Sequence, residues 1–261
     1  MKILRLVAAA AMLIPACPNG GLAGRAVAQS PDDDRWGEVD VIERTVKLAP
    51  GAAVSVSTIY GPVEVETVEG DTAEVRVERT ARRREDFATR PVFVDGSAGA
   101  LRVRGERDTS QEPMRVRHHV RLRVPRRVAL SIEMINGRVG VGDVDGPVEL
   151  HRINGATVVA GATGRLVASR INGTLTASVA WTAGSAVELE TINGAVELRL
   201  AGARDLDVSV DKYSGEVRVD LPNVTVLSSA PREVYRARVG SGGPAVSIHQ
   251  VNGSVRILSE R

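Results

Sequence analysis

The sequence has little cysteine and few aromatic residues, and both shortages narrow the classes of protein that it can encode. Cys17 is the only cysteine among 261 residues, which excludes a scaffold held by disulfide bonds. Aromatic residues make up 3% of the chain, so a core must be built from Val, Leu, Ile and Ala, which favours a thin, β-rich core. Hydrophobic residues account for 43%, enough to bury such a core, so a disordered polymer is excluded as well.

The segment 1–28 is typical of a secretory signal peptide. Lys2 and Arg5 precede the apolar run 6–14, and the small residues Ala26 and Ala28 form a cleavage site. The run is shorter than the roughly 20 residues that a membrane-spanning helix needs, and no later stretch is apolar enough, so no transmembrane segment is expected. We therefore expect export to the periplasm or the extracellular space after cleavage near Ala28.

A second interpretation of this segment is a lipoprotein signal processed at Cys17, which would leave the chain with a lipid anchor. Cleavage after Ala28 changes the charge balance. Residues 1–28 contain Lys2, Arg5 and Arg25 and no acidic residue, so residues 29–261 hold 31 basic and 32 acidic residues, a net charge of −1. This balance gives no electrostatic reason to expect a nucleic-acid partner.

The middle of the chain contains an internal repeat. Four Ile-Asn-Gly tripeptides, which contain Asn136, Asn154, Asn172 and Asn193, recur at a nearly constant interval. Tyr213-Ser214-Gly215 follows one interval later, and Val251-Asn252-Gly253 follows about two intervals after that. Ile59-Tyr60-Gly61 is a diverged upstream copy. After each glycine, apolar and polar residues alternate, which indicates a strand with one buried face.

Identical tripeptides at a fixed period are best explained by coils that stack in register. The sequence predicts an all-β fold, a single parallel β-solenoid of about 18–21 residues per coil, right-handed by the usual chirality of parallel crossovers, with irregular N-terminal strands and capping insertions. Stacked coils lie about 4.8 Å apart. An antiparallel β-sandwich remains the alternative. In the solenoid, the corner residues form a ladder of amides: Asn136, Asn154, Asn172, Asn193 and Asn252.

The remaining segments are assigned by composition. We expect a signal peptide at 1–28, a flexible leader at 29–38, a strand-rich N-terminal part at 39–130 with a charged insertion near 82–90, and the Asn-Gly repeat at 131–261. The segment 228–244, rich in Gly and Pro, is expected to be a loop-rich insertion before the last coil.

With the repeat and its flanking Val-x-Val strands in place, the sequence resembles the bacterial putative-adhesin family, also called domain of unknown function 4097. The charged insertion and Val124-Pro125-Arg126 resemble that family too, over roughly residues 40–258. In architecture the chain is similar to the Gly-Ile-Asn head domains of other putative adhesins. The resemblance implies an exported protein built from repeated β-strands. It implies no established enzymatic activity and no cofactor.

Candidate catalytic and metal-binding residues are few. Glu188 and Glu190 stand on one face of a strand, about 7 Å apart, within the range of glycosidase carboxylates. Alternate outward positions of any soluble strand are often Glu, however, so we expect no catalytic residues and no enzyme. His118 and His119 point to opposite faces of a strand and lack partners at ligand spacing, so neither a metal site nor a cofactor is expected.

The position two residues before each corner forms a second column, which includes Arg152, Arg170 and Lys212. Two neighbouring guanidinium groups would repel each other unless an anion lay between them, so the three residues are a candidate anion site. They could equally extend into solvent or pair with acids on adjacent turns. We expect a non-enzymatic, adhesin-like protein whose surface binds an envelope polymer, a glycan or a protein. A structural envelope component and a carbohydrate-active enzyme are the alternatives.

Overall fold

The computed structural model describes residues 36–106 and 115–260, and no helix within these ranges is long and apolar enough to cross a membrane. The expected signal peptide 1–28 and Cys17 lie outside the described residues, as does most of the expected leader 29–38. The described residues all belong to one compact unit, Arg35–Arg261, so the expected segments 39–130 and 131–261 lie in the same unit.

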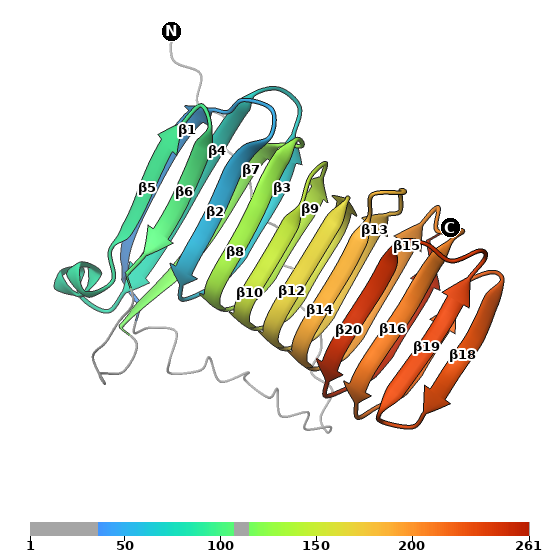
Figure 1. Cartoon of the computed structure of the whole chain (residues 1–261). Coiled ribbons are helices and arrows are strands. Elements are labelled where there is room, and N and C mark those ends of the chain that lie inside the picture. Colours follow the sequence, from blue (N-terminus) through green and yellow to red (C-terminus); the bar gives the residue numbers. More distant parts are fainter. Residues whose placement is uncertain (1–35, 107–114, 261) are drawn as a thin grey trace, which may run out of the picture. The chain divides into compact units, whose positions relative to one another are not determined.

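The strands form two large sheets that face each other across an aliphatic core (Figure 1). The ten-stranded sheet has the order β1 (Glu38–Lys47), β4 (Thr72–Ala81), β7 (Val116–Pro125), β3 (Val63–Val68), β9 (Val139–Val144), β11 (Thr157–Thr163), β13 (Leu175–Ala180), β15 (Val196–Ala201), β21 (Val255–Ser259) and β17 (Val217–Asp220). The eleven-stranded sheet has the order β18 (Val224–Ala230), β19 (Val234–Val239), β16 (Leu206–Tyr213), β20 (Ala245–Val251), β14 (Ala186–Asn193), β12 (Arg165–Asn172), β10 (Val148–Asn154), β8 (Val128–Asn136), β2 (Ala52–Ile59), β6 (Ala100–Gly105) and β5 (Val92–Ser97). A 3-10 helix, Arg84–Thr89, lies in the charged segment expected near 82–90.

The core follows from the period-two alternation of the strands. In β15, for example, the aliphatic residues Val196, Leu198 and Leu200 are buried while Glu197 and Arg199 face outward. The same pattern recurs in both sheets, and the buried residues form one continuous cluster of Val, Leu, Ile and Ala between them. Each strand therefore presents one face to the core and one to solvent.

The predicted fold, a single parallel β-solenoid, is wrong, because the chain forms two mixed sheets. The strands of the Asn-Gly repeats do pair in parallel, with Ile153 beside Ile135 and Ile171. At the β1 end of the ten-stranded sheet and at both ends of the eleven-stranded sheet, however, the chain folds back on itself and pairs antiparallel. The antiparallel pairs are β1 with β4, β4 with β7, β5 with β6, β16 with β19, and β18 with β19.

The C-terminal strands also depart from their order in the sequence. The segment 228–244 was predicted to be a loop-rich insertion, but it contains the end of β18 and the whole of β19. The last two strands, β20 and β21, then insert between β14–β15 and β16–β17. As a result Asn252 lies directly beside Asn193, and the earlier Ser214 is the last member of the series.

The glycines of the repeat are required because successive chain turns approach closely at this corner. A Cβ atom added to Gly155, Gly173 or Gly194 would lie closer than 3.0 Å to the carbonyl group of the glycine on the neighbouring strand. The close approach lets the N–H of Gly173 donate a hydrogen bond of 3.0 Å to the carbonyl oxygen of Asn193. The neighbouring group is backbone and cannot move aside, so this column has room for glycine alone.

The asparagines beside these glycines are joined by their side chains. The Nδ2 of each of Asn154, Asn172, Asn193 and Asn252 donates a hydrogen bond of 3.0 Å to Oδ1 of the preceding member, beginning at Asn136. Ser214 ends the series by donating from Oγ to Oδ1 of Asn252 at 2.9 Å. Each inner asparagine both donates and accepts, so the ladder stabilises neighbouring strands in one register.

Replacing Gly173 by Ala is expected to destabilise the protein by about 1–3 kcal/mol, because the new Cβ would overlap the backbone of Gly155. The matched control is Gly140→Ala on β9, where nothing lies within 4 Å of the added Cβ. Urea unfolding followed by circular dichroism measures both variants. Equal stabilities for the two would contradict the close-approach explanation.

Replacing Asn172 by Ala removes one donated and one accepted hydrogen bond and is expected to cost about 1–2 kcal/mol. Asn136→Ala, which removes a single bond at the end of the ladder, should cost about half as much. The same unfolding measurement tests the ratio. A loss at Asn136 as large as that at Asn172 would argue against an additive ladder.

Candidate functional site

Seven adjacent strands of the eleven-stranded sheet each contain one residue in the left-handed region, with φ between 53° and 60°. These residues are Thr58, Met134, Arg152, Arg170, Thr191, Gln250 and Lys212. At six of them the strand places two successive side chains outside before it returns to the core, whereas Thr58 in β2 is itself buried. In β10, His151 and Arg152 both face outward, and Ile153 is buried. A non-glycine residue in this region destabilises the fold by about 1 kcal/mol. The left-handed conformation adds a second row of outward side chains to the sheet.

The predicted anion site, Arg152, Arg170 and Lys212, lies entirely in this extra row. Arg152 and Arg170 are on the neighbouring strands β10 and β12, but β14 and β20 separate Lys212 from Arg170. Nη2 of Arg152 lies 2.5 Å from Oε1 of Glu133 on β8. Arg170 makes no side-chain hydrogen bond or ion pair with the residues that the structure describes. The arrangement thus brings two of the three residues together, and a carboxylate neutralises one of these.

The row beside it on the same outer face carries polar side chains, and we refer to its five members that line one hollow as the central row. Its members are His151, Ser169, Glu190, His249 and Asp211, on β10, β12, β14, β20 and β16. Each residue is the direct cross-strand neighbour of the next, so the spacing is about 4.8 Å. Nδ1 of His151 lies 2.7 Å from Oγ of Ser169, within hydrogen-bond distance.

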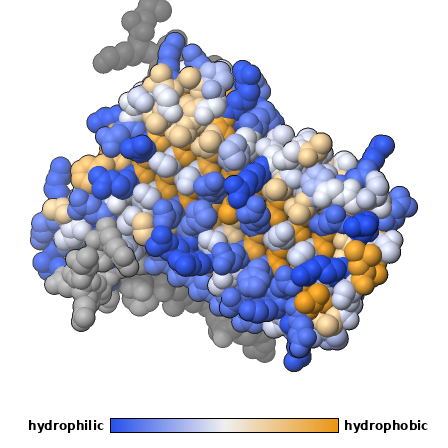
Figure 2. Space-filling view, viewed as in Figure 1, coloured by the Kyte–Doolittle hydropathy of each residue, from blue (hydrophilic) through white to orange (hydrophobic). Residues whose placement is uncertain are grey.

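The central row lines a shallow hollow of about 370 Å³, together with Glu188, Ser209 and Ser247 from the next row. The serines are small and leave room between the longer acidic and histidine side chains. Figure 2 shows hydrophilic side chains spread over this face, with hydrophobic atoms visible between them. Glu190 and His249 are exposed and make no side-chain hydrogen bond or ion pair within the described part of the chain. They are therefore free to bind a ligand.

The two carboxylates considered for glycosidase chemistry have different surroundings. Glu188 accepts a hydrogen bond of 2.8 Å from Nη2 of Arg165, whereas Glu190 stands between Ser169 and His249. Asp211, at the end of the central row, is held by Arg236 at 2.8 Å. Among residues 36–106 and 115–260, no three His, Cys, Asp or Glu side chains are grouped closely enough to hold a metal ion.

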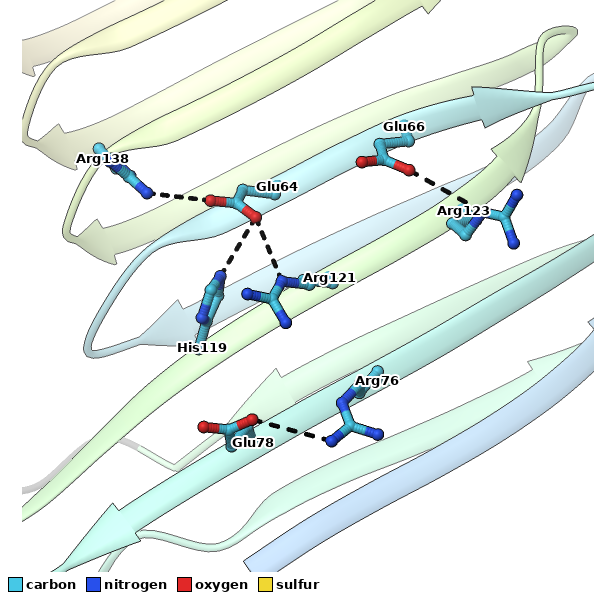
Figure 3. A network of polar contacts seen from close by, with 8 residues as sticks. All are labelled: Glu64, Glu66, Arg76, Glu78, His119, Arg121, Arg123 and Arg138. Atoms are coloured by element: carbon cyan, nitrogen blue, oxygen red, sulfur yellow. Dashed lines mark hydrogen bonds and ion pairs between the residues drawn. The ribbon is translucent and has the colours of Figure 1, made fainter. Parts of the chain in front are cut away.

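The outer face of the ten-stranded sheet carries a network in which several basic side chains share acidic partners (Figure 3). Glu64 is the centre of this network and contacts Arg138 at 3.1 Å, His119 at 3.2 Å and Arg121 at 3.3 Å. Burial raises the pKa of Glu64, but hydrogen bonds and charge attraction from these three residues outweigh it and lower the pKa below its ordinary value. The charged side chains of this network pair with one another, so fewer of them are available to bind a ligand.

The repeat places all members of the central row in one column, because each stands three residues before a corner residue, but it does not give their spatial order. Ser169 and Glu190 stand at ordinary outward positions, and His249 joins them because β20 inserts beside β14. The period indicated that the strands of His151, Ser169 and Glu190 are neighbours, and no local signal indicated that β20 lies between β14 and β16.

Comparisons with known proteins do not assign the chain to a family. No family model matches it, and no curated protein matches it. Matching solved structures include a putative cell adhesion protein from Clostridium sporogenes, with 8% identity over 85% of this chain and 100% of that chain and a TM-score of 0.40. A putative adhesin from Bacteroides fragilis has 9% identity over 85% and 97%, with a TM-score of 0.32. A putative lipid binding protein from Parabacteroides distasonis has 11% identity over the same shares, with a TM-score of 0.25. Likeness at these scores carries no argument about function.

His118 and His119 of β7 do point to opposite faces. His118 is buried between the sheets, where Nδ1 accepts a hydrogen bond of 3.4 Å from the N–H of Tyr60. Burial, assisted by the charges of Arg79 and Arg90, lowers the pKa of His118 from 6.5 to about 4. The folded protein therefore holds this imidazole neutral at pH values where an unfolded chain would protonate it.

The lowered pKa of His118 predicts that stability falls as the pH drops from about 6.5 to about 4, because the unfolded chain binds a proton that the folded chain excludes. A His118→Gln variant lacks this proton uptake, so its free energy of unfolding should fall by about 3 kcal/mol less over that interval. Urea unfolding at several pH values compares the two slopes. Parallel pH profiles for the two proteins would show that His118 is not excluded from protonation.

Proposed function

We propose that the chain is an exported, non-enzymatic binding protein that holds a neutral glycan of the cell envelope along the central row. The observation that carries the proposal is the register of His151, Ser169, Glu190, His249 and Asp211 on five adjacent strands. Such a row offers hydrogen-bonding groups at a constant spacing of about 4.8 Å along the sheet. A ligand that repeats a small chemical unit can use several of these groups at once.

The chemistry of the row favours a ligand rich in hydroxyl groups. Carboxylates accept hydrogen bonds, a serine hydroxyl both donates and accepts, and a neutral imidazole has one donor and one acceptor. A sugar hydroxyl can satisfy each of these groups. The carboxylate of Glu190, which has no basic partner among the described residues, repels phosphate and other anions, which supports a neutral glycan over a nucleic acid or an acidic polymer at this row.

Binding without cleavage is supported by the surroundings of the acidic residues. A glycosidase needs two carboxyl groups free to act on opposite sides of one bond, with one of them holding a proton. Glu188 is engaged by Arg165 and stands on an open face. We therefore propose that the protein retains the polymer without cleaving it. The pattern of the segment 1–28, which is typical of a signal peptide, supports export.

Co-sedimentation of the purified chain with the neutral polysaccharides chitin and cellulose, and with peptidoglycan sacculi as an acidic polymer, tests the proposal, which predicts retention by a neutral polymer. A Glu190→Gln/His249→Gln variant should bind the retained polymer at least tenfold more weakly, because two exposed groups of the row are altered. Glu197→Gln/Arg256→Gln is the matched control, since these two residues are cross-strand neighbours on the outer face of the opposite sheet.

Undiminished binding by the central-row variant would place the ligand elsewhere. Release of soluble sugars from the polymer, lost in Glu188→Gln or Glu190→Gln, would replace the proposal by the enzyme alternative. If the chain binds none of these polymers, the glycan hypothesis fails.

A further inference from the structure

The two sheets do not end together at the C-terminal side of the described unit. The ten-stranded sheet ends at β17, which directly follows β16 in the chain. The eleven-stranded sheet continues beyond β16 with β19 and then β18. The inner face of β18 consequently lacks a facing strand, and Val226, the cross-strand neighbour of buried Ala237, is 53% exposed.

β18 is an edge strand without a charged residue. Its sequence, from Val224 to Ala230, is VTVLSSA, and it pairs with β19 on one side alone among the described strands. Leu227 is 56% exposed beside Val226, where the register with β19 shifts. Figure 2 shows hydrophobic surface at this end of the molecule, over β18. A free backbone edge that carries exposed aliphatic side chains is a template for pairing with another strand.

The opposite end of the ten-stranded sheet is protected in the way that soluble proteins protect edges. β1 also exposes apolar residues, Val39 and Val41, but it carries Glu38, Asp40, Glu43, Arg44 and Lys47 as well. Asp40 is paired with Arg79 on β4, and Arg44 stands in register with the buried Val75, on the core side of the strand. Charged residues on an edge and an inward-pointing charge oppose further pairing. The edge strands β1 and β18 therefore differ in their capacity for pairing with another strand.

We propose that β18 forms a two-fold contact with β18 of a second copy of this chain, so that the eleven-stranded sheets of the two copies continue into one another. In such a contact each β18 strand pairs with the β18 strand of the other copy, so a charged residue near the two-fold axis would face the same residue of the other copy. A strand with no charge avoids this repulsion, whereas β1 would bring like charges together. A two-fold contact between the two β18 strands uses the free edge of both, so the contact closes as a dimer and does not extend into a filament.

The contact has a consequence for ligand binding that does not depend on which ligand is bound. The two-fold axis of an antiparallel strand pair is perpendicular to the sheet, so the outer faces of both copies lie on the same side. Any site on the outer face of the eleven-stranded sheet is then present twice on one surface. A long polymer could be held at both sites, which raises the apparent affinity without a new kind of contact.

Sedimentation equilibrium of the full purified chain tests the dimer. The wild-type chain should have twice the mass of one chain, and Leu227→Lys and Leu227→Glu should each have the mass of one chain, because like charges meet near the axis. A mixture of the two variants should regain the double mass, since opposite charges then meet. Val39→Lys on β1 is the matched control, an exposed valine on the other edge, and should remain a dimer.

A wild-type chain that keeps the mass of one chain at all concentrations would overturn the proposal, as would charged variants of Leu227 that remain dimers. Failure of the mixture to restore the double mass, with both variants shown to be folded by circular dichroism, would also overturn it. Larger assemblies, or dissociation of the Val39→Lys variant, would place the contact at the other end. None of these outcomes depends on glycan binding.

Discussion

The close approach of backbone at the Asn-Gly corner is the constraint on which the rest of the structure depends. Gly137, Gly155, Gly173 and Gly194 lie so close to one another that a side chain cannot fit between them. This approach leaves one register for neighbouring strands, because a shift by one residue would bring a Cβ atom into the column and turn the apolar side chains outward. The asparagine ladder and the stacked isoleucines both follow from that register.

The same register organises the outer surface. Because equal positions of successive strands are neighbours, any outward position becomes a row that crosses the sheet. The central row arises in this way, and the left-handed residues before each corner add a second row that contains Arg152 and Arg170. The two outer faces nevertheless use charge differently. Around Glu64 acids and bases neutralise one another, whereas Glu190 and His249 are left available on the opposite face.

Part of this arrangement could be predicted from sequence. The spacing of Asn136, Asn154 and Asn172 indicated parallel neighbours, because equal intervals between equal residues have a simple geometric cause. The antiparallel ends were missed, since β18 and β19 carry no repeat and their pairing depends on long-range contacts. The position of Asn252 was missed for a related reason. Its separation from Ser214 along the chain suggested two further turns, whereas the hairpin β18–β19 occupies that interval and β20 returns to β14. The period of a sequence repeat indicates how successive turns of the chain stack. It does not determine which distant strands pair with each other.

Engineered cysteine pairs test this spatial order most directly. In a chain with Cys17→Ser, the pair Glu190→Cys with His249→Cys joins β14 and β20, which are direct neighbours. The Cα atoms of direct neighbours lie within the range of a disulfide bond, and those two strands apart do not. The account predicts a disulfide in this pair under mild oxidation and none in Glu190→Cys with Asp211→Cys, where β20 lies between. The reverse result would mean that β16 stacks on β14 in the order of the sequence, and the register on which the central row depends would be wrong.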